Sequence, residues 1–379
     1  MQFNLFHLMP YPYLPDDFDV KYDTASLTLP NGIFDPKRGA ALYNRYLDEL
    51  EYAEQLGFDA VAVNEHHQSA YGLMPSPNVV IGALSRRTSR IRLCALGNAI
   101  ALRDHPLRVA EEIAMLDNIT DGRIISGFVR GIGFECYAQS VSPARSIARF
   151  REAHDLIVKA WKSREPFQWI SENYEFRYVN VWPRSVQQPH PPIWVPGTGS
   201  FETMQWVAQH RYSYLSVYAP TRVIKGWFDG FRAAAKECGY EPAPEQIGFM
   251  VPIYVAETDQ RAHEEGRQHI EWLYHKALKI RTEYYFPAGY LSVKSFRGMI
   301  SSGAKPFTEL SYEELIELGY AVVGSPATVR DKLKALQAYL GFGNLCAVLQ
   351  IGDMPHERTM KNMEMFASQV MPALAGKRH

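Results

Sequence analysis

The chain has 379 residues, of which 46% are hydrophobic and 21% are charged, so it can bury a large core and is not globally disordered. Its 40 Lys and Arg residues balance 41 Asp and Glu residues, and the net charge of −1 argues against a nucleic-acid or membrane-surface partner. Four widely spaced cysteines without a Cys-x-x-Cys pair indicate neither a disulfide framework nor a structural zinc site. Because we find no signal peptide and no long apolar run, we expect a cytoplasmic protein.

Short strand-like runs alternate with helical patterns along the chain. We predict strands at residues 3–9, 58–63, 91–96, 124–129, 192–195, 212–217, 247–255 and 345–351. We predict helices at residues 39–56, 77–88, 107–119, 144–161, 201–209, 223–238, 327–340 and 357–370. About eight strand-then-helix units imply parallel strands covered by helices, and at this length they favour an α/β fold of the (β/α)8 TIM-barrel type over an open sheet. We therefore treat residues 1–379 as a single barrel domain.

Three stretches interrupt this alternation, at residues 11–37, 165–191 and 257–318. The first and the third follow predicted strands, so we expect them on the catalytic face of the barrel, where they can cover a substrate. The second follows a helix and is expected to wrap the opposite rim. The third is mostly helical and contains several aromatic residues.

The sharpest local motif is Asn64-Glu65-His66-His67, which follows the second predicted strand. At that place in a barrel, a histidine can move a proton near neutral pH or hydrogen-bond a bound intermediate. A structural pair at a strand end explains the motif equally well when it is taken alone. A metal site would need further ligands, and Asp104, His105 and Asp121 match no recognised ligand spacing, so we predict no metal.

A second motif, residues 196–200, connects a predicted strand to a helix and contains Gly197, Thr198, Gly199 and Ser200. Its glycines and the helix N-terminus suit an anion such as a phosphate, and Thr203 adds a hydroxyl group. The alternative is an ordinary turn in which Ser200 caps the helix.

Two further strand ends have residues suited to a ligand. Arg130 follows the fourth predicted strand and can bind a phosphate or carboxylate, or form a salt bridge at the rim. Gly97 and Asn98 end the third predicted strand, where small residues can let a flat ring lie against the backbone or simply form a turn.

Taken together, the motifs resemble the bacterial luciferase-like monooxygenases over nearly the whole chain. The matching segments are residues 57–67, 105–112, 116–117, 122–123, 127, 130–131, 196–206, 323–326 and 365–372. The resemblance implies a (β/α)8 barrel that uses reduced FMN made by a separate flavin reductase. In the family, O2 adds to flavin carbon 4a, and the resulting peroxide oxygenates the substrate.

The resemblance also implies roles for individual residues. We predict His66 and His67 as the catalytic residues, with His66 at the position of the family's catalytic histidine. The predicted cofactor-binding residues are Asn98 and Ala99, where the flavin ring rests, and Arg130, Gly197, Thr198, Gly199, Ser200 and Thr203 around the FMN phosphate. In some relatives an unusual cis peptide lies beside the ring-binding strand.

The sequence departs from the luciferase α-subunit at two of these positions. Val129 replaces a reactive cysteine beside the arginine, and Gly199 replaces a glutamate before the phosphate-binding serine. Luminescence with a long-chain aldehyde is therefore not implied, and we expect a larger or more aromatic substrate.

The leading interpretation is a two-component monooxygenase that takes reduced FMN, O2 and a small organic substrate. Hydroxylation, Baeyer–Villiger insertion and oxidation at nitrogen or sulfur all remain open. The alternatives are a deazaflavin-dependent oxidoreductase of the same fold, a non-catalytic flavin-binding protein and, more weakly, a metal-dependent hydrolase. Because the family commonly forms dimers through barrel helices, we also expect a homodimer.

Overall fold

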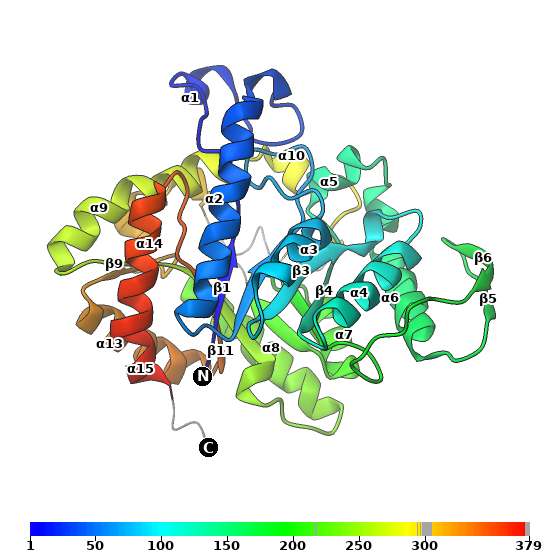
Figure 1. Cartoon of the computed structure of the whole chain (residues 1–379). Coiled ribbons are helices and arrows are strands. Elements are labelled where there is room, and N and C mark those ends of the chain that lie inside the picture. The colour runs from blue at the N-terminus through cyan, green and yellow to red at the C-terminus, as the bar shows by residue number, and fades with distance from the viewer. Residues whose placement is uncertain (217, 294, 296, 298–304, 376–379) are drawn as a thin grey trace.

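Eight parallel strands close into a barrel in the computed structural model, which describes residues 1–216, 218–293, 295, 297 and 305–375 (Figure 1). In spatial order they are β11 (Asn344–Val348), β1 (Gln2–His7), β2 (Ala60–Val63), β3 (Arg92–Ala99), β4 (Ile124–Val129), β7 (Ile193–Gly197), β8 (Ser213–Ser216) and β9 (Ile247–Val255). Pairing of β9 with both β8 and β11 completes the ring. The predicted (β/α)8 TIM barrel is thus confirmed.

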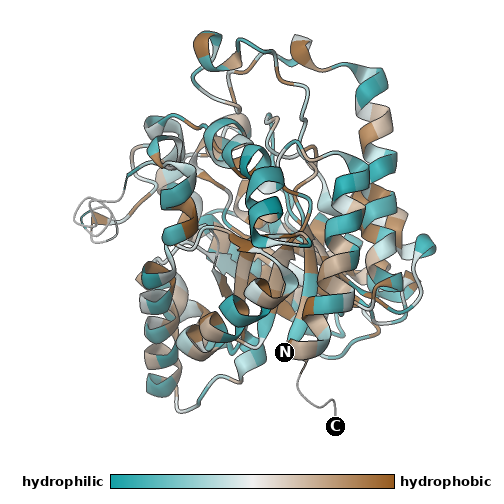
Figure 2. Ribbon diagram, turned by 90° about the vertical axis from the view of Figure 1, so that its left-hand side faces the viewer, coloured by the Kyte–Doolittle hydropathy of each residue, from teal (hydrophilic) through white to brown (hydrophobic). Residues whose placement is uncertain are grey.

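The barrel strands are buried on both faces, against the barrel interior and against the surrounding helices. All nine residues of β9 are buried, as are all four of β2, which is why these segments read as continuous apolar runs and not as alternating patterns. Figure 2 shows hydrophobic strands at the centre and more hydrophilic helices around them.

One major helix follows each barrel strand, although the helix assigned to β9 comes only after the third interrupting stretch and a further short strand. These eight helices are α2 (Pro36–Gln55), α3 (Pro77–Arg87), α4 (Leu107–Ile119), α6 (Ser146–Lys162), α7 (Phe201–His210), α8 (Thr221–Glu237), α13 (Pro326–Leu340) and α14 (His356–Met365). In α2 the buried side chains Leu42, Tyr46, Leu50 and Ala53 recur at helical spacing, and the Asp35 carboxylate caps the first turn by accepting from Lys37 N–H at 2.8 Å.

The remaining elements lie outside this alternation. Among the described residues, the further α-helices and strands are α1 (Phe18–Lys21), α5 (Gly133–Ala138), β5 (Phe167–Ile170), β6 (Glu175–Val179), α9 (Asp259–Glu271), α10 (Thr282–Tyr285), α12 (Tyr312–Glu317), β10 (Val322–Gly324) and α15 (Met371–Leu374). The prediction missed β10, which is only three residues long, and missed the antiparallel β5–β6 hairpin, which stands away from the barrel in Figure 1. No helix in the part of the chain that the structure describes is long and apolar enough to span a membrane.

The three interrupting stretches lie at different ends of the barrel. Lys279, in the third stretch, donates to the Tyr22 carbonyl at 2.8 Å, so the first stretch packs on the third above the carboxyl ends of the strands. Gln187, in the second stretch, donates to the carbonyl of Ile124, the first residue of β4, at 2.8 Å. The second stretch therefore lies against the amino-terminal rim. Part of the third stretch, 294, 296 and 298–304, falls outside the described residues.

Glu54 fastens the loop before β3 to the last turn of α2. Its carboxylate accepts N–H groups of Ser89 at 3.0 Å, Arg90 at 2.7 Å and Ile91 at 2.8 Å. Partial burial by itself would raise the pKa of this carboxyl group, but the backbone hydrogen bonds outweigh it and lower the pKa to about 2.

We expect Glu54→Gln to lower the free energy of unfolding by about 1–3 kcal/mol at pH 7, because one amide oxygen cannot replace two carboxylate oxygens. Since the folded-state pKa lies below the unfolded value, this contribution is fully present above about pH 4.5 and is lost as the pH falls toward 2. Urea unfolding of both proteins at pH 7 and pH 3 measures the difference. The exposed Glu237→Gln serves as the control, and a difference between wild type and Glu54→Gln that does not shrink at pH 3 would contradict the assignment.

Candidate active site

A cavity of about 230 Å³ opens at the carboxyl ends of the barrel strands. Its wall takes residues from the ends of β2, β3, β4 and β7, from the middle of β9, and from the segment 278–290 of the third stretch. The predicted residues that line it are His66, Arg130, Gly197, Thr198, Ser200 and Thr203. Residues from widely separated regions of the sequence thus share one pocket.

His66 lies on this wall with both ring nitrogens engaged. Its Nδ1 is 3.0 Å from Glu135 Oε1, and its Nε2 is 2.7 Å from Asn64 Nδ2. The Glu135 side chain, on α5, is 1% exposed. Its other oxygen, Oε2, accepts the Ile132 N–H at 2.7 Å. The sequence analysis missed Glu135, and its place three residues after Ile132, at the third position of α5, fits helix capping.

His67 belongs to a second pair, in which Glu65 lines the cavity and His67 does not. Its Nε2 is 2.7 Å from Glu65 Oε1, and Glu65 Oε2 accepts from Arg103 Nη2 at 2.7 Å and from the Ala99 N–H at 3.1 Å. Adjacent residues point in opposite directions, so only His66 of the two predicted catalytic residues lines the pocket. The catalytic role of His67 remains a sequence prediction.

The wall formed by β3 consists of Leu96 and Gly97, which are joined by a cis peptide bond. A Cβ atom on Gly97 would approach the Gly127 carbonyl carbon of β4 to 2.6 Å, so glycine is needed for this close packing of two strands. Asn98 and Ala99, both predicted to contact the flavin, are fully buried and lie outside the cavity lining. Asn98 Nδ2 instead donates to Asn78 Oδ1 at 3.2 Å.

The turn between β7 and α7 forms another end of the cavity. Ser200 caps α7, and its Oγ donates to Glu202 Oε2 at 2.8 Å. Gly199 has φ of +86°, and a Cβ there would overlap the Trp227 indole, so this glycine serves the turn itself. Its N–H donates to the Tyr214 hydroxyl at 3.2 Å, and Gly199 does not line the cavity.

Arg130 connects the end of β4 to the third stretch. Its Nη1 donates to the Tyr290 carbonyl at 3.0 Å, and its guanidinium lies 3.6 Å from the centroid of the Tyr290 ring. The Tyr290 hydroxyl donates back to the Gly131 carbonyl at 2.6 Å. These contacts hold the aromatic segment over the pocket. The cavity takes a second guanidinium from Arg151 on α6, which the sequence analysis did not select.

Four tyrosines also line the cavity: Tyr71, Tyr218, Tyr285 and Tyr290. Burial raises the pKa of each of them, that of Tyr285 to about 12, so all four remain neutral hydrogen-bonding groups at neutral pH. The Tyr71 ring packs 4.6 Å from the His66 ring. The sequence analysis did not select any of the four, although it noted the aromatic residues of the third stretch, which include Tyr285 and Tyr290.

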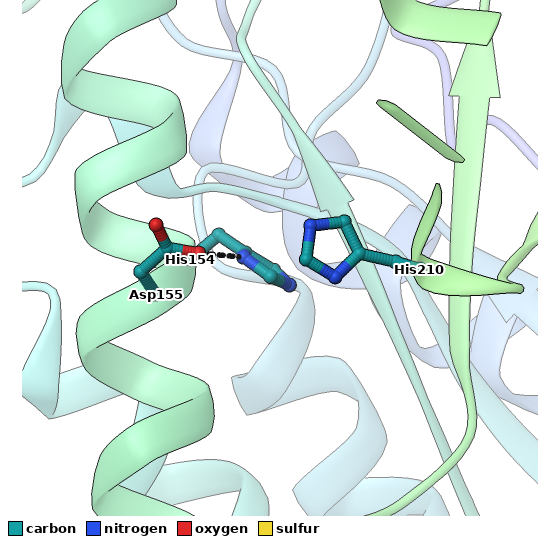
Figure 3. Close-up of side chains that lie close together, drawn as sticks. All are labelled: His154, Asp155 and His210. Carbon is teal, nitrogen blue, oxygen red and sulfur yellow. Dashed lines mark hydrogen bonds and ion pairs between the residues drawn. The ribbon is translucent and has the colours of Figure 1, made fainter. Parts of the chain in front are cut away.

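A cluster of possible metal ligands lies elsewhere, between α6 and the end of α7 (Figure 3). His154 Nδ1 is 2.8 Å from Asp155 Oδ1, its Nε2 is 2.9 Å from the Tyr212 hydroxyl, and His210 lies beside the ring. Burial and the neighbouring His154 lower the pKa of His210 to about 4. Because both His154 nitrogens are engaged and Lys159 and Lys162 line the same hollow, we interpret the cluster as packing between two helices.

The other metal candidates considered from the sequence do not converge. The Asp104 carboxylate pairs with Arg149 at 3.2 Å, and His105 packs edge-on against Phe176. Neither they nor Asp121 lines the cavity.

Comparison with known proteins gives a consistent picture. The sequence profile of the family described as "Luciferase-like monooxygenase" matches residues 27–342. The chain is 27% identical over 352 residues to the uncharacterized protein y4wF of Sinorhizobium fredii, covering 90% of this chain and 96% of that protein. It is 24% identical over 350 residues to the oxygenase component of flavin-dependent trigonelline monooxygenase from Acinetobacter baylyi, covering 90% and 93%.

Solved structures share the fold over the whole chain. The monooxygenase RslO1 from Streptomyces bottropensis superposes with a TM-score of 0.76 at 25% identity, covering 99% of this chain and 100% of that one. The oxygenating constituent of 3,6-diketocamphane monooxygenase from Pseudomonas putida, solved with FMN, gives 0.76 at 20% identity, with 98% of each chain covered. An F420-dependent secondary alcohol dehydrogenase gives 0.68 at 15% identity, with 99% of each chain covered. The last two likenesses concern the fold alone.

Proposed function

Because the chain belongs to the luciferase-like monooxygenase family, we propose that it is the oxygenase component of a two-component monooxygenase in the cytoplasm. In this proposal, a separate flavin reductase supplies reduced FMN, and the enzyme uses O2 to oxygenate a small organic substrate. The observation that carries the proposal is the placement of His66 and the anion-binding groups Arg130, Ser200 and Thr203 in one cavity.

The residues of the cavity fit FMN in kind. Part of the wall is apolar and is formed by Leu96 and Gly97 of β3 and by Val195 of β7. Elsewhere on the wall, the guanidinium of Arg130 and the N-terminus of the ten-residue helix α7 suit a phosphate group. At Gly197 a Cβ would approach the Tyr214 ring to 2.8 Å, so the turn keeps its close fit only with glycine.

Two present contacts bear on phosphate binding, and only the first of them has to change. The Ser200 hydroxyl now donates to Glu202, and Arg130 now donates to the Tyr290 carbonyl. Glu202 also accepts from Ser292 at 3.2 Å, so its carboxylate can turn toward that residue and away from the phosphate. Arg130 has further N–H groups and can bind a phosphate while it keeps Tyr290 in place.

Bound reduced FMN would supply the electrons that activate O2. The chain itself would hold the phosphate, keep water away with the aromatic segment, and move protons through His66. The rings of Tyr71, Tyr218 and Tyr285 favour a flat or largely apolar substrate with a polar group that can accept a hydrogen bond.

A deazaflavin-dependent oxidoreductase and a non-catalytic flavin-binding protein are the alternatives. Anaerobic titration with reduced FMN, followed by a pulse of O2, distinguishes them from the oxygenase. We expect tight binding and then O2 consumption that precedes the return of oxidised-flavin absorbance. Binding without this delay would support the alternatives, and no binding would refute the FMN assignment.

We expect His66→Ala to leave the affinity for reduced FMN nearly unchanged and to abolish substrate oxygenation, because proton transfer at this position contributes on the order of 100-fold or more to the rate. The measurement is the amount of product formed per O2 consumed. The substrate is chosen as a compound that changes the interval between O2 consumption and the return of oxidised-flavin absorbance in the wild type. His263→Ala, on α9 and away from the cavity, is the control. Unchanged product yield in His66→Ala would contradict the catalytic role.

We expect Arg130→Ala to weaken binding of reduced FMN by about 1–3 kcal/mol, the size of a hydrogen bond to a charged group. Binding of riboflavin, which has no phosphate, should change much less. Fluorescence titration of both flavins separates phosphate binding from closure by Tyr290, because loss of closure would weaken both equally. Arg145→Ala, which removes an exposed guanidinium paired with Asn173, is the matched control.

We further propose that the protein is a homodimer joined through α3 and α4. Both helices expose apolar side chains on their outer faces: Val79 is 71% exposed, Met115 49% and Ile119 44%. The two helices pack side by side, and Asn78 Nδ2 on α3 donates to Glu112 Oε2 on α4 at 2.8 Å. Exposed apolar groups gathered on neighbouring helices are typical of a protein interface.

Met115→Glu should shift the protein toward the monomer, because it places a charge in the centre of this face. Size-exclusion chromatography with light scattering measures the change. Tyr178→Glu alters a residue that is 85% exposed on the β5–β6 hairpin and should leave the mass unchanged. A monomeric wild type, or a dimer unaffected by Met115→Glu, would contradict this interface.

A further inference from the structure

We propose that Glu135 is the positioning residue of His66 and holds its imidazole in the Nδ1–H form, with the unprotonated Nε2 directed at Asn64 beside the cavity. The proposal rests on the proposed function in one respect, that His66 acts as a proton acceptor during oxygenation. The hydrogen-bond arrangement itself is independent of any flavin.

The bonds around Glu135 determine the direction of its bond to His66. Oε2 accepts the Ile132 N–H at 2.7 Å, and Oε1 accepts the His67 N–H at 3.3 Å. Backbone N–H groups only donate, so they favour the ionised carboxylate, which only accepts. The remaining contact, 3.0 Å from Oε1 to His66 Nδ1, is then a bond that the imidazole donates. Neutral His66 therefore has its proton on Nδ1 and a lone pair on Nε2.

Asn64 supports the same assignment from the opposite side of the ring. Its Nδ2, a donor, lies 2.7 Å from His66 Nε2. Its Oδ1 is buried without a hydrogen-bond partner among the residues that the structure describes. Rotation of the amide by half a turn would bring Oδ1 to Nε2 as an acceptor. Asn64 can therefore serve His66 both before and after Nε2 takes up a proton.

The proton balance of the step is simple. A group in the cavity gives a proton to Nε2, and the resulting imidazolium keeps Nδ1–H on the Glu135 carboxylate while the Asn64 amide rotates so that its Oδ1 accepts from Nε2–H. No electron is transferred to the protein, and return of the proton restores the starting state. The carboxylate stabilises the imidazolium by its charge at hydrogen-bond distance.

The neighbouring pair of Glu65 and His67 provides an internal comparison. Glu65 is also completely buried, but Arg103 pairs with its second oxygen at 2.7 Å, and His67 does not line the cavity. At Glu135 the corresponding oxygen accepts a backbone N–H, and among the described residues no Lys or Arg forms an ion pair with this carboxylate. The charge of Glu135 is thus available to His66, whereas that of Glu65 is already paired.

The direct test is the protonation of the His66 ring nitrogens, read from 15N NMR of protein labelled at histidine, at pH 8 and without flavin. The difference from the spectrum of His66→Gln identifies the His66 signals. We expect a protonated Nδ1 and an unprotonated Nε2 in the wild type. A wild-type spectrum with the proton on Nε2 would overturn the proposal.

Glu135→Gln keeps the volume of the side chain but offers one acceptor oxygen in place of two. We expect it to lose the uniform Nδ1–H form and to lower kcat about 100-fold, with KM and the affinity for FMN changed less than about twofold. Glu135→Asp keeps the charge and should recover part of kcat. If Glu135 has only a structural role, Glu135→Gln will lower the unfolding temperature and leave the ring protonation of His66 in the folded protein unchanged. That result would overturn the positioning role.

The two proposals fail separately. If the enzyme shows no oxygenation, the proposed function fails, yet the nitrogen signals still decide whether Glu135 sets the His66 proton. If oxygenation occurs but Glu135→Gln leaves both the ring protonation and kcat unchanged, the inference fails and the proposed function stands.

Discussion

Closure of the barrel is the constraint on which the rest of the structure depends. Once β8 and β11 both pair with β9, eight parallel strands share one direction, and all their carboxyl ends meet at one rim. His66, Arg130 and Ser200 are far apart in the sequence, and only this closure brings them into one cavity. The close approach of Gly97 and Gly127 lets β3 and β4 form a smooth part of that wall.

Buried carboxylates determine how the two histidines of the site are oriented. Two carboxylates, Glu65 and Glu135, are withdrawn from water beside two adjacent histidines. A buried charge is costly unless it is paired and hydrogen-bonded, and each carboxylate has N–H donors on both oxygens. Because the two carboxylates have different partners, His66 lines the cavity, whereas His67 pairs with Glu65 and lies outside the lining.

Aromatic packing closes the cavity from above. The Arg130 guanidinium lies against Tyr290, and the Tyr290 hydroxyl returns to the backbone beside Arg130, so the third stretch is attached to the rim by a charged group that also suits a phosphate. Binding of an anion at Arg130 and closure of the aromatic segment are therefore physically linked. The neutral tyrosines below provide a lining that excludes water and still offers hydrogen bonds.

Local sequence patterns were enough to predict the barrel and much of its mouth. Helix 107–119 and strands 124–129 and 247–255 were predicted at their exact bounds, because local apolar periodicity reflects burial against neighbouring layers. The strand-end positions of His66, Arg130 and the 196–200 turn followed from the same alternation.

Only the tertiary structure decided which side chains meet. Glu135 lies 69 residues from His66, and no local pattern reports a hydrogen bond across that separation. It also showed that Asn98 and Ala99 lie behind the wall, that β10 exists, and that the residues from 165 to 191 contain a hairpin. The direction of a side chain at a strand end depends on the packing of neighbouring strands, which the chain acquires only when the barrel closes.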